Sequence, residues 1–391
     1  MHAHPSLPAL EPLEQRFCLS AAPTGLSPAQ VRHAYGFDRI VFSRNGKALR
    51  SNGSGQTIAI VDAYDDPNIA NDLRVFDRTF HLSDTDWRGK FALTKVMQKG
   101  TRPNKDWALE ISLDVEWAHA IAPKAHILLV EARSPTVPDL LRAIDYARSQ
   151  KGVVAVSMSW GGDESPFETF YDNHLTTPPG HIGGYGIKGG VTFVTSSGDT
   201  GAPASWPAVS PNVLAVGGTT LTLGPGNTWQ NEVAWAGSGG GLSVFEPVTT
   251  AAPDVAYNAD PATGYSVYCS YQAGAGGPWS TVGGTSAGAP QWASLIALVD
   301  QGRALKGLGS LDIQQTLRAI YNVPSSDFHD IVQGSNGFLA GPGFDLVTGR
   351  GSPIANRLVP GIIHFTQTRN VKTRALSKTS TPSLLGNPVL S

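Results

Sequence analysis

Five short apolar runs, separated by stretches with helical periodicity, constrain the fold of this chain more than any other feature. The runs cover residues 57–62, 126–131, 153–157, 191–196 and 213–216. Continuous apolar runs of this length are typical of strands that are buried on both faces of a sheet. Helical stretches at about 68–80, 107–121 and 137–149 alternate with them. Since this alternation favours parallel strands with right-handed crossovers, we predict an α/β domain of three layers, in which helices flank a central, mostly parallel sheet.

The remaining segments suggest the limits of this domain. Residues 1–25 show no periodicity, and we expect either a leader for export or a disordered terminus there. A globular domain is expected over 26–360, with further helices near 286–302 and 311–320 and a glycine-rich loop at 330–351. The polar stretch 361–391 is expected to be a peripheral tail.

The composition excludes several classes of function. With 29 basic and 31 acidic residues among 391, the chain has no charge excess that would indicate nucleic acid or a membrane surface as a partner. No apolar run is long enough to span a bilayer. Cys18 and Cys269 are the only cysteines, so we expect no disulfide framework. Sparse cysteine suits an exported bacterial protein, and we expect this one to be secreted.

The sequence GGTSAGAP at residues 283–290 contains the strongest candidate for a nucleophile. Its first two glycines allow a sharp turn and a close approach by a substrate. Ser286 follows them where an apolar helical run begins, near the positive end of the helix dipole. Pro290 lies in the first turn, where its missing N–H costs little. The alternative interpretation is a serine that only caps the helix.

Two acidic residues lie on one face of the predicted helix at 107–121. Glu110 and Asp114 are four positions apart, so their side chains lie on the same side of a helix. Two carboxylates held close together cannot both ionise cheaply, so they share a proton and can accept one from a hydroxyl group. The alternative is an acidic face exposed to solvent.

A third acidic residue, Asp199, follows the apolar run at 191–196 in the sequence SSGDTGA. A protonated aspartic acid at the end of a strand could donate a hydrogen bond to a developing oxyanion. An aspartate between glycines is also a common turn residue, and this reading stays open.

Taken together, these motifs resemble those of the sedolisins, the serine-carboxyl peptidases with a subtilisin-like fold, over most of residues 27–355. Ser286 lies in a match to the family's nucleophile motif GTSxxxP. Glu110 and Asp114 match the catalytic pair of the ExxxD(V/I)E helix, and Asp199 matches the oxyanion-hole aspartate of SGDSG. Residues 157–161, SMSWG, match SxSWG, whose tryptophan lies near the acid relay.

The resemblance implies an endopeptidase that cleaves peptides or proteins by acyl transfer at acidic pH. Ser286 would attack the peptide carbonyl, Glu110 would accept its proton, and Asp114 would orient Glu110. Neutral Asp199 and the Ser286 backbone N–H would hold the oxyanion. Asp62 takes the place of an outer acidic residue that extends the relay, where the family often has glutamate.

Two segments near the end of the domain resemble the sedolisin calcium site. They are HDI at 329–331 and GPGFD at 341–345. The implied ligands are the side chains of Asp330 and Asp345 and the backbone carbonyls of Ile331, Gly341 and Gly343. Oxygen ligands on a glycine-rich loop suit Ca²⁺, so we expect one structural calcium ion. Two ordinary turn aspartates are the alternative.

Two other functions remain open at this point. A subtilisin-like neutral serine peptidase needs a histidine on the helix of Glu110, but His119 is nine positions away and lacks the usual His-Gly-Thr setting. Asp199 also stands where subtilisins place an asparagine. A non-catalytic binding protein could keep the same fold. Fewer than thirty residues precede Ser27, whereas sedolisins generally carry a long prosegment, so either the domain folds unaided or an upstream part is missing. We expect a monomer whose partners are its substrates.

Overall fold

A central eight-stranded sheet organises the protein, whose computed structural model describes residues 10–12, 15–246, 250–274 and 276–365. Seven strands follow the order β12-β11-β10-β8-β5-β7-β6, and β15 also pairs with β11. All these pairs are parallel except β11 with β12. The strands are β5 (Thr57–Ala63), β6 (Leu93–Met97), β7 (His126–Ala132), β8 (Val153–Met158), β10 (Thr192–Ser196), β11 (Leu214–Leu223), β12 (Trp229–Ala234) and β15 (Val255–Asn258). The predicted α/β fold with a mostly parallel sheet is therefore confirmed.

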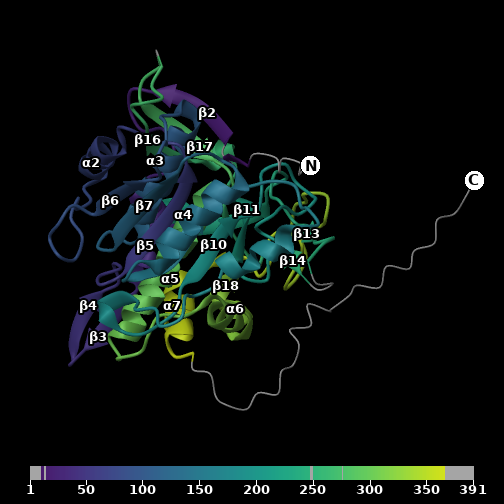
Figure 1. Ribbon diagram of the computed structural model, residues 1–391. Coiled ribbons are helices and arrows are strands. Elements are labelled where there is room, and N and C mark those ends of the chain that lie inside the picture. The colour runs from purple at the N-terminus through teal and green to yellow at the C-terminus, as the bar shows by residue number, and fades with distance from the viewer. Residues whose placement is uncertain (1–9, 13–14, 247–249, 275, 366–391) are drawn as a thin grey trace, which may run out of the picture.

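Helices cover the sheet as the alternation predicted (Figure 1). Helices α3 and α5 pack against each other and against β5, whereas α4 lies on the other face, against β5, β7 and β8. The α-helices are α1 (Pro28–Ala34), α2 (Ile69–Phe80), α3 (Lys105–Ile121), α4 (Val137–Ser149), α5 (Gly288–Ala304), α6 (Ile313–Asn322) and α7 (Ala355–Ile363). None of them, within the part of the chain that the structure describes, has the length and hydropathy of a membrane-spanning helix.

Short elements connect and extend these layers. The short strands are β1 (Glu11–Pro12), β2 (Gln15–Ser20), β3 (Val41–Arg44), β4 (Lys47–Arg50), β9 (Trp160–Gly161), β13 (Gly241–Leu242), β14 (Ala251–Ala252), β16 (Tyr265–Tyr268), β17 (Trp279–Gly283), β18 (Phe328–His329) and β19 (Ser352–Pro353). The 3-10 helices are η1 (Phe37–Arg39), η2 (Glu168–His174), η3 (Gly184–Gly186), η4 (Pro225–Asn227), η5 (Pro261–Thr263), η6 (Thr285–Ala287) and η7 (Ser325–Asp327).

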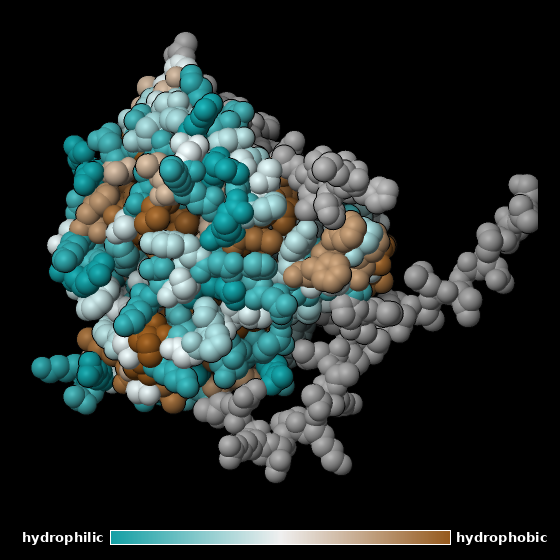
Figure 2. Space-filling model, in the orientation of Figure 1, coloured by the Kyte–Doolittle hydropathy of each residue, from teal (hydrophilic) through white to brown (hydrophobic). Residues whose placement is uncertain are grey.

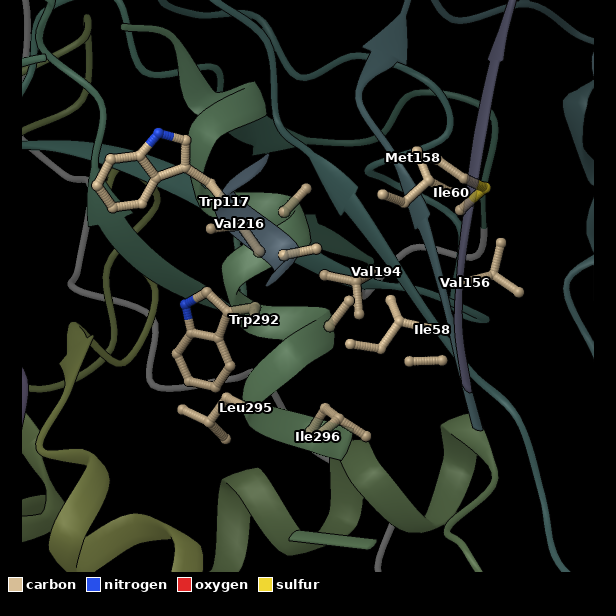
Figure 3. Close-up of a cluster of buried hydrophobic side chains, with 14 of the residues drawn as sticks. Ile58, Ile60, Trp117, Val156, Met158, Val194, Val216, Trp292, Leu295 and Ile296 are labelled. Atoms are coloured by element: carbon tan, nitrogen blue, oxygen red, sulfur yellow. The ribbon is translucent and has the colours of Figure 1, made fainter. Parts of the chain in front are cut away.

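The core between the sheet and α5 is fully buried (Figure 3). Trp292, Leu295 and Ile296 of α5 face side chains from β5, β10 and β11, namely Ile58, Ile60, Val194 and Val216. Val156 and Met158 of β8 point to the opposite face of the sheet, since Val156 pairs in register with Ala59 and Phe193. Every residue of α5 from Gly288 to Arg303 is buried, and α3 is buried from Trp107 to Ile121. A helix enclosed on all sides needs apolar residues around its whole circumference, so the polar residues of α3 require a particular explanation.

The two ends of the described chain differ from the expected limits. Strand β2, inside the expected leader or disordered segment, pairs antiparallel with β17, so residues 15–20 are ordered by the free edge of that strand. Helix α7 runs across the expected boundary at residue 360, because Ile362 and Ile363 are buried in the core. Residues 1–9 and the tail from 366 lie outside the described residues.

Candidate active site

The predicted nucleophile lies at the junction of β17 and α5. Gly284 has a φ of +115°, which other residues rarely adopt, and a Cβ at Gly283 would lie 2.5 Å from the Ala259 carbonyl oxygen. Ser286 lies in η6, and α5 begins at Gly288 with no side-chain cap. Ser286 is therefore not the capping residue of this helix, and the glycine turn fixes its position at the carboxyl end of the sheet.

Helix α3 carries the predicted acid pair into the interior. The Asn104 side chain caps this helix, since its Oδ1 accepts from the N–H groups of Asp106 and Trp107 at 2.9 and 3.1 Å. Glu110 and Asp114 are both fully buried. The alternative of a solvated acidic face is therefore wrong. Because α3 also packs against η6, the helix brings both carboxyl groups to the side of the protein that holds the predicted nucleophile.

A serine that the sequence did not single out connects the acid pair to the nucleophile. The Ser159 hydroxyl lies 2.8 Å from Asp114 Oδ1 and 3.4 Å from the Ser286 carbonyl oxygen. Burial raises the pKa of Asp114 well above its usual value, and the nearby Asp62 carboxyl adds to this rise. The hydrogen bond from Ser159 opposes both effects. Ser159 lies in the quoted SMSWG motif, which was the available signal for it.

The outer acidic residue lies behind Asp114, at the end of β5. Burial raises the pKa of Asp62 to about 8. Within the described residues neither of its carboxylate oxygens has a hydrogen-bond partner. The neighbouring Trp160 is fully buried, and its indole N–H donates to the Val61 carbonyl at 2.7 Å. Asp62 and Asp114 therefore form a buried carboxyl pair whose protonated forms are favoured.

Asp199 reaches the same region from the loop after β10. Its Oδ1 accepts hydrogen bonds from both the backbone N–H and the hydroxyl group of Thr285, each at 2.8 Å. Burial raises the pKa of Asp199 to about 7, although the bonds from Thr285 lower it. A simple turn residue would bond within its own loop. Asp199 instead accepts hydrogen bonds from Thr285, the residue that precedes Ser286. The sequence had not indicated this contact.

Asp114 and Asp199 are thus connected to the Ser286 turn through Ser159 and Thr285, and Glu110 lies one helical turn before Asp114, whereas His119 points elsewhere. The His119 Nε2 lies 2.9 Å from the Ser83 carbonyl oxygen and 3.3 Å from Asp77 Oδ1. Burial lowers the pKa of His119 to about 4. The imidazole is therefore neutral and occupied in another part of the structure, which removes the support for a histidine-dependent triad.

The predicted calcium ligands lie on one loop. The Gly343 N–H donates to both carboxylate oxygens of Asp330 at 3.1 and 3.0 Å, and the Gly341 N–H donates to Asp345 Oδ2 at 3.1 Å. Both carboxylates are therefore held against the same glycine turn. Ile331 is buried beside Val347 in a small hydrophobic cluster, so the residue that follows Asp330 is anchored in the protein. This donor set contains only oxygen and is compatible with a calcium ion.

A second group of ligating side chains was not anticipated from the sequence. One atom each from Asp66, Asp72 and Cys269 lie within 4.8 Å of one another, and all three residues are buried. The carboxylates already accept hydrogen bonds, Asp66 from Asn68 and Asp72 from Ser270. Asp66 follows β5, Asp72 lies in α2 and Cys269 follows β16, and the sequence could not place these segments together.

Comparison with known proteins shows which family this chain belongs to. The Subtilase family (Peptidase_S8) matches residues 100–328. Kumamolisin of Bacillus sp. (strain MN-32) is 31% identical over 394 residues, which cover 88% of this chain and 65% of that protein. Sedolisin of Pseudomonas sp. (strain 101) is 33% identical over 204 residues, 42% of this chain and 33% of that protein. The chain spans less than two thirds of the length of these curated relatives.

The fold has a solved counterpart. The structure described as "Pseudomonas sedolisin (serine-carboxyl proteinase) complexed with two molecules of pseudo-iodotyrostatin" superimposes with a TM-score of 0.69 at 24% identity, covering 88% of this chain and 99% of that one. This likeness shows the fold, and the sequence matches carry the relationship. The protein therefore belongs to the subtilase family and, within it, to the sedolisins, whose fold is subtilisin-like.

Proposed function

We propose that this protein is a serine-carboxyl endopeptidase that cleaves peptides or proteins at acidic pH. The observation that carries the proposal is the position of the Ser159 hydroxyl between Asp114 and the Ser286 carbonyl, which joins the buried acid pair to the nucleophile turn. The peptidase unit would begin near residue 26 and include α7.

In the proposed reaction, Ser286 Oγ attacks the carbonyl carbon of the scissile peptide bond and transfers its proton to Glu110. The carbonyl π electrons move to the oxygen and form a tetrahedral oxyanion. Protonated Asp199 and the Ser286 backbone N–H donate hydrogen bonds to it. The C–N bond then breaks, and the leaving amine takes the proton from Glu110. Water attacks the resulting ester with Glu110 again as the base, which releases the acid and restores Ser286.

The buried carboxyl groups of Asp199, Asp62 and Asp114 support the proposal that this chemistry operates at low pH. Asp199 donates a hydrogen bond only when it is protonated, and its pKa of about 7 keeps it protonated below neutrality. Burial of Asp62 and Asp114 likewise favours their protonated forms. A proton shared along these carboxyl groups would hold Asp114 in the state that hydrogen-bonds Glu110.

We also propose a structural calcium ion on the 330–351 loop. The side chains of Asp330 and Asp345 and the carbonyls of Ile331, Gly341 and Gly343 would hold it. When bound, the ion would neutralise these two carboxylates, which accept hydrogen bonds from the N–H groups of Gly341 and Gly343. The enzyme would act as a secreted monomer on peptide or protein substrates.

The test is a cleavage profile of a peptide library from pH 2 to pH 8, with calcium present, for the wild type, Glu110→Gln and His119→Gln. We expect activity below pH 7 that Glu110→Gln abolishes and that His119→Gln retains. An optimum at neutral or alkaline pH that depends on His119 would instead support the subtilisin-like mechanism. A folded wild type that cleaves nothing across this range would indicate a binding protein.

A further inference from the structure

A cavity of about 460 Å³ lies between helix α4 and the β6 edge of the central sheet. Its apolar surface comes from Val96 and Met97 of β6, Val130 of β7 and Tyr146 of α4. Val130 is buried, whereas 52% of Met97 and 41% of Tyr146 are exposed. Hydrophobic surface is visible between β6, β7 and α4, bordered by hydrophilic side chains (Figure 2). The cavity therefore offers a ligand an accessible apolar floor.

Basic side chains surround this floor. Arg133, Arg142 and Lys99 all line the cavity, and Asp139 is the acidic residue among the lining side chains. Three cations and one carboxylate leave a formal charge of 3 − 1 = +2. Lys99 has no ion pair with any described residue. The cavity thus combines an apolar floor with an excess of positive charge.

The two guanidinium groups are held in place before any ligand binds. Arg133 Nε and an Arg133 terminal nitrogen lie 3.1 and 3.2 Å from the two oxygens of Asp139, and Arg142 forms an ion pair with the same carboxylate. Burial would raise the pKa of Asp139, but its bonds from Ser134, Arg133 and Arg142 lower it overall. About half of each arginine side chain is still exposed, at 55% and 59%. Each can therefore donate further hydrogen bonds to a ligand at little entropic cost.

The cavity shares the carboxyl edge of the sheet with the predicted catalytic groups. Arg133 directly follows β7, and two residues earlier Glu131 pairs in register with Asp62 of β5. Ser286 lies beside β10 and β11, and β10 is separated from β6 by β8, β5 and β7. These four strand spacings correspond to roughly 19 Å, or about six residues of extended peptide. β6 is also the last strand of the sheet on this side among the described residues. An extended peptide of about six residues along this edge of the sheet can therefore reach from Ser286 to the cavity.

We propose that this cavity is an accessory substrate subsite that binds an acidic side chain of a peptide together with an adjacent apolar side chain. The carboxylate binds Arg133, Arg142 and Lys99, because guanidinium groups match carboxylate geometry. The apolar neighbour packs on Met97 and Tyr146. The identity of the ligand as substrate rests on the proposed peptidase function, whereas the binding itself does not.

The experiment measures binding rather than turnover. Two end-blocked, fluorescein-labelled peptides that differ only in a central Leu-Glu-Phe or Leu-Gln-Phe are titrated into the Ser286→Ala protein at pH 6, with anisotropy as the readout. We expect the glutamate peptide to bind about tenfold more tightly in 50 mM salt, and this preference to shrink in 300 mM salt because the charges are exposed. Lys99→Gln and Arg142→Gln should each reduce the preference severalfold.

The controls distinguish binding at this subsite from nonspecific electrostatic attraction, and they distinguish failure of the subsite from failure of the proposed peptidase function. Lys151 is an exposed lysine just beyond α4, outside the cavity lining, so Lys151→Gln should leave the preference unchanged. Equal affinity for the two peptides, or a preference that survives Lys99→Gln, overturns the proposal. The Lys99 side chain has no hydrogen bond or ion pair with the residues that the structure describes, so the substitution removes no such contact there. If the glutamate preference depends on Lys99 but the wild type cleaves nothing, the subsite stands and the peptidase function fails.

Discussion

Replacing Asp199 by asparagine tests the buried acid most directly, because asparagine preserves its contacts and removes its titration. The asparagine oxygen can accept both hydrogen bonds from Thr285, as Oδ1 of Asp199 does at 2.8 Å. Its amide group can donate toward an oxyanion at any pH. The substitution therefore separates the shape of this site from its charge.

The magnitude follows from the shift of the Asp199 pKa from 3.8 to about 7. Between these values the folded state holds a proton that the unfolded state has released, so the stability from Asp199 is complete at low pH and is lost as pH rises. The linkage relation gives a loss of about 0.6 kcal/mol at pH 4 and about 4 kcal/mol at pH 7. Relative to Asp199→Asn, the wild type should therefore lose about 3 kcal/mol of stability between these two pH values.

The assay is denaturant unfolding of both proteins at pH 4, 5, 6 and 7, with the slope of the transition compared at each pH. Activity against one peptide gives a second readout. We expect Asp199→Asn to cleave more slowly than the wild type. The activity of the wild type should fall as the pH rises, because only about a tenth of Asp199 would still be neutral at pH 8, and in Asp199→Asn this fall should move to higher pH. If the two proteins differ by the same free energy at every pH and share one activity profile, Asp199 does not titrate as argued and the reasoning is refuted.

Three further substitutions or treatments test other parts of the site. Ser286→Ala should abolish cleavage and leave circular dichroism and melting temperature unchanged; turnover near that of the wild type would contradict the nucleophile assignment. Ser159→Ala should destabilise the protein by about 1–3 kcal/mol and raise the pKa of Asp114 further, since it removes a buried hydrogen bond that lowers this pKa. The pH–activity profile of Ser159→Ala should shift toward higher pH. Ser159→Thr keeps a hydroxyl group and should restore the wild-type profile. Chelation with EDTA should lower the melting temperature and expose the 330–351 loop to proteolysis, because a ligand at a hundredfold excess over Kd stabilises by about 2.7 kcal/mol. Asp345→Ala should abolish that response, and metal analysis that finds no calcium in the purified wild type would contradict the site.

The central strands were predictable because burial on both faces leaves a continuous apolar run in the sequence. Strand β6 was not predicted, since Leu93 is buried but Thr94 and Met97 are exposed, and an edge strand of mixed character gives no such run. Strand β2 was missed for a related reason. Its order comes from pairing with β17, more than 250 residues away, and not from its own pattern.

The candidate catalytic residues could be proposed from motifs, but their hydrogen-bond connections could not. A motif indicates which residue types recur together along the chain. The hydrogen bond from Ser159 to Asp114 joins residues that are 45 positions apart, and the bond from Thr285 to Asp199 joins residues that are 86 positions apart. The burial of Glu110 also depends on packing around α3, which the acidic spacing alone left open. The cavity beside α4 depends on how Asp139 orients two arginines, and no spacing in the sequence encodes that geometry.

The position of β5 has a consequence for how the chain reaches this fold. It is the first strand of the central sheet in chain order, yet it lies between β7 and β8, which begin at residues 126 and 153. As the chain emerges during synthesis, both hydrogen-bonding edges of β5 stay open until more than 60 further residues have appeared. Non-local parallel pairing of this kind slows folding, and open apolar edges favour association between chains. We therefore expect refolding from denaturant to be slow, with a yield that falls steeply as protein concentration rises.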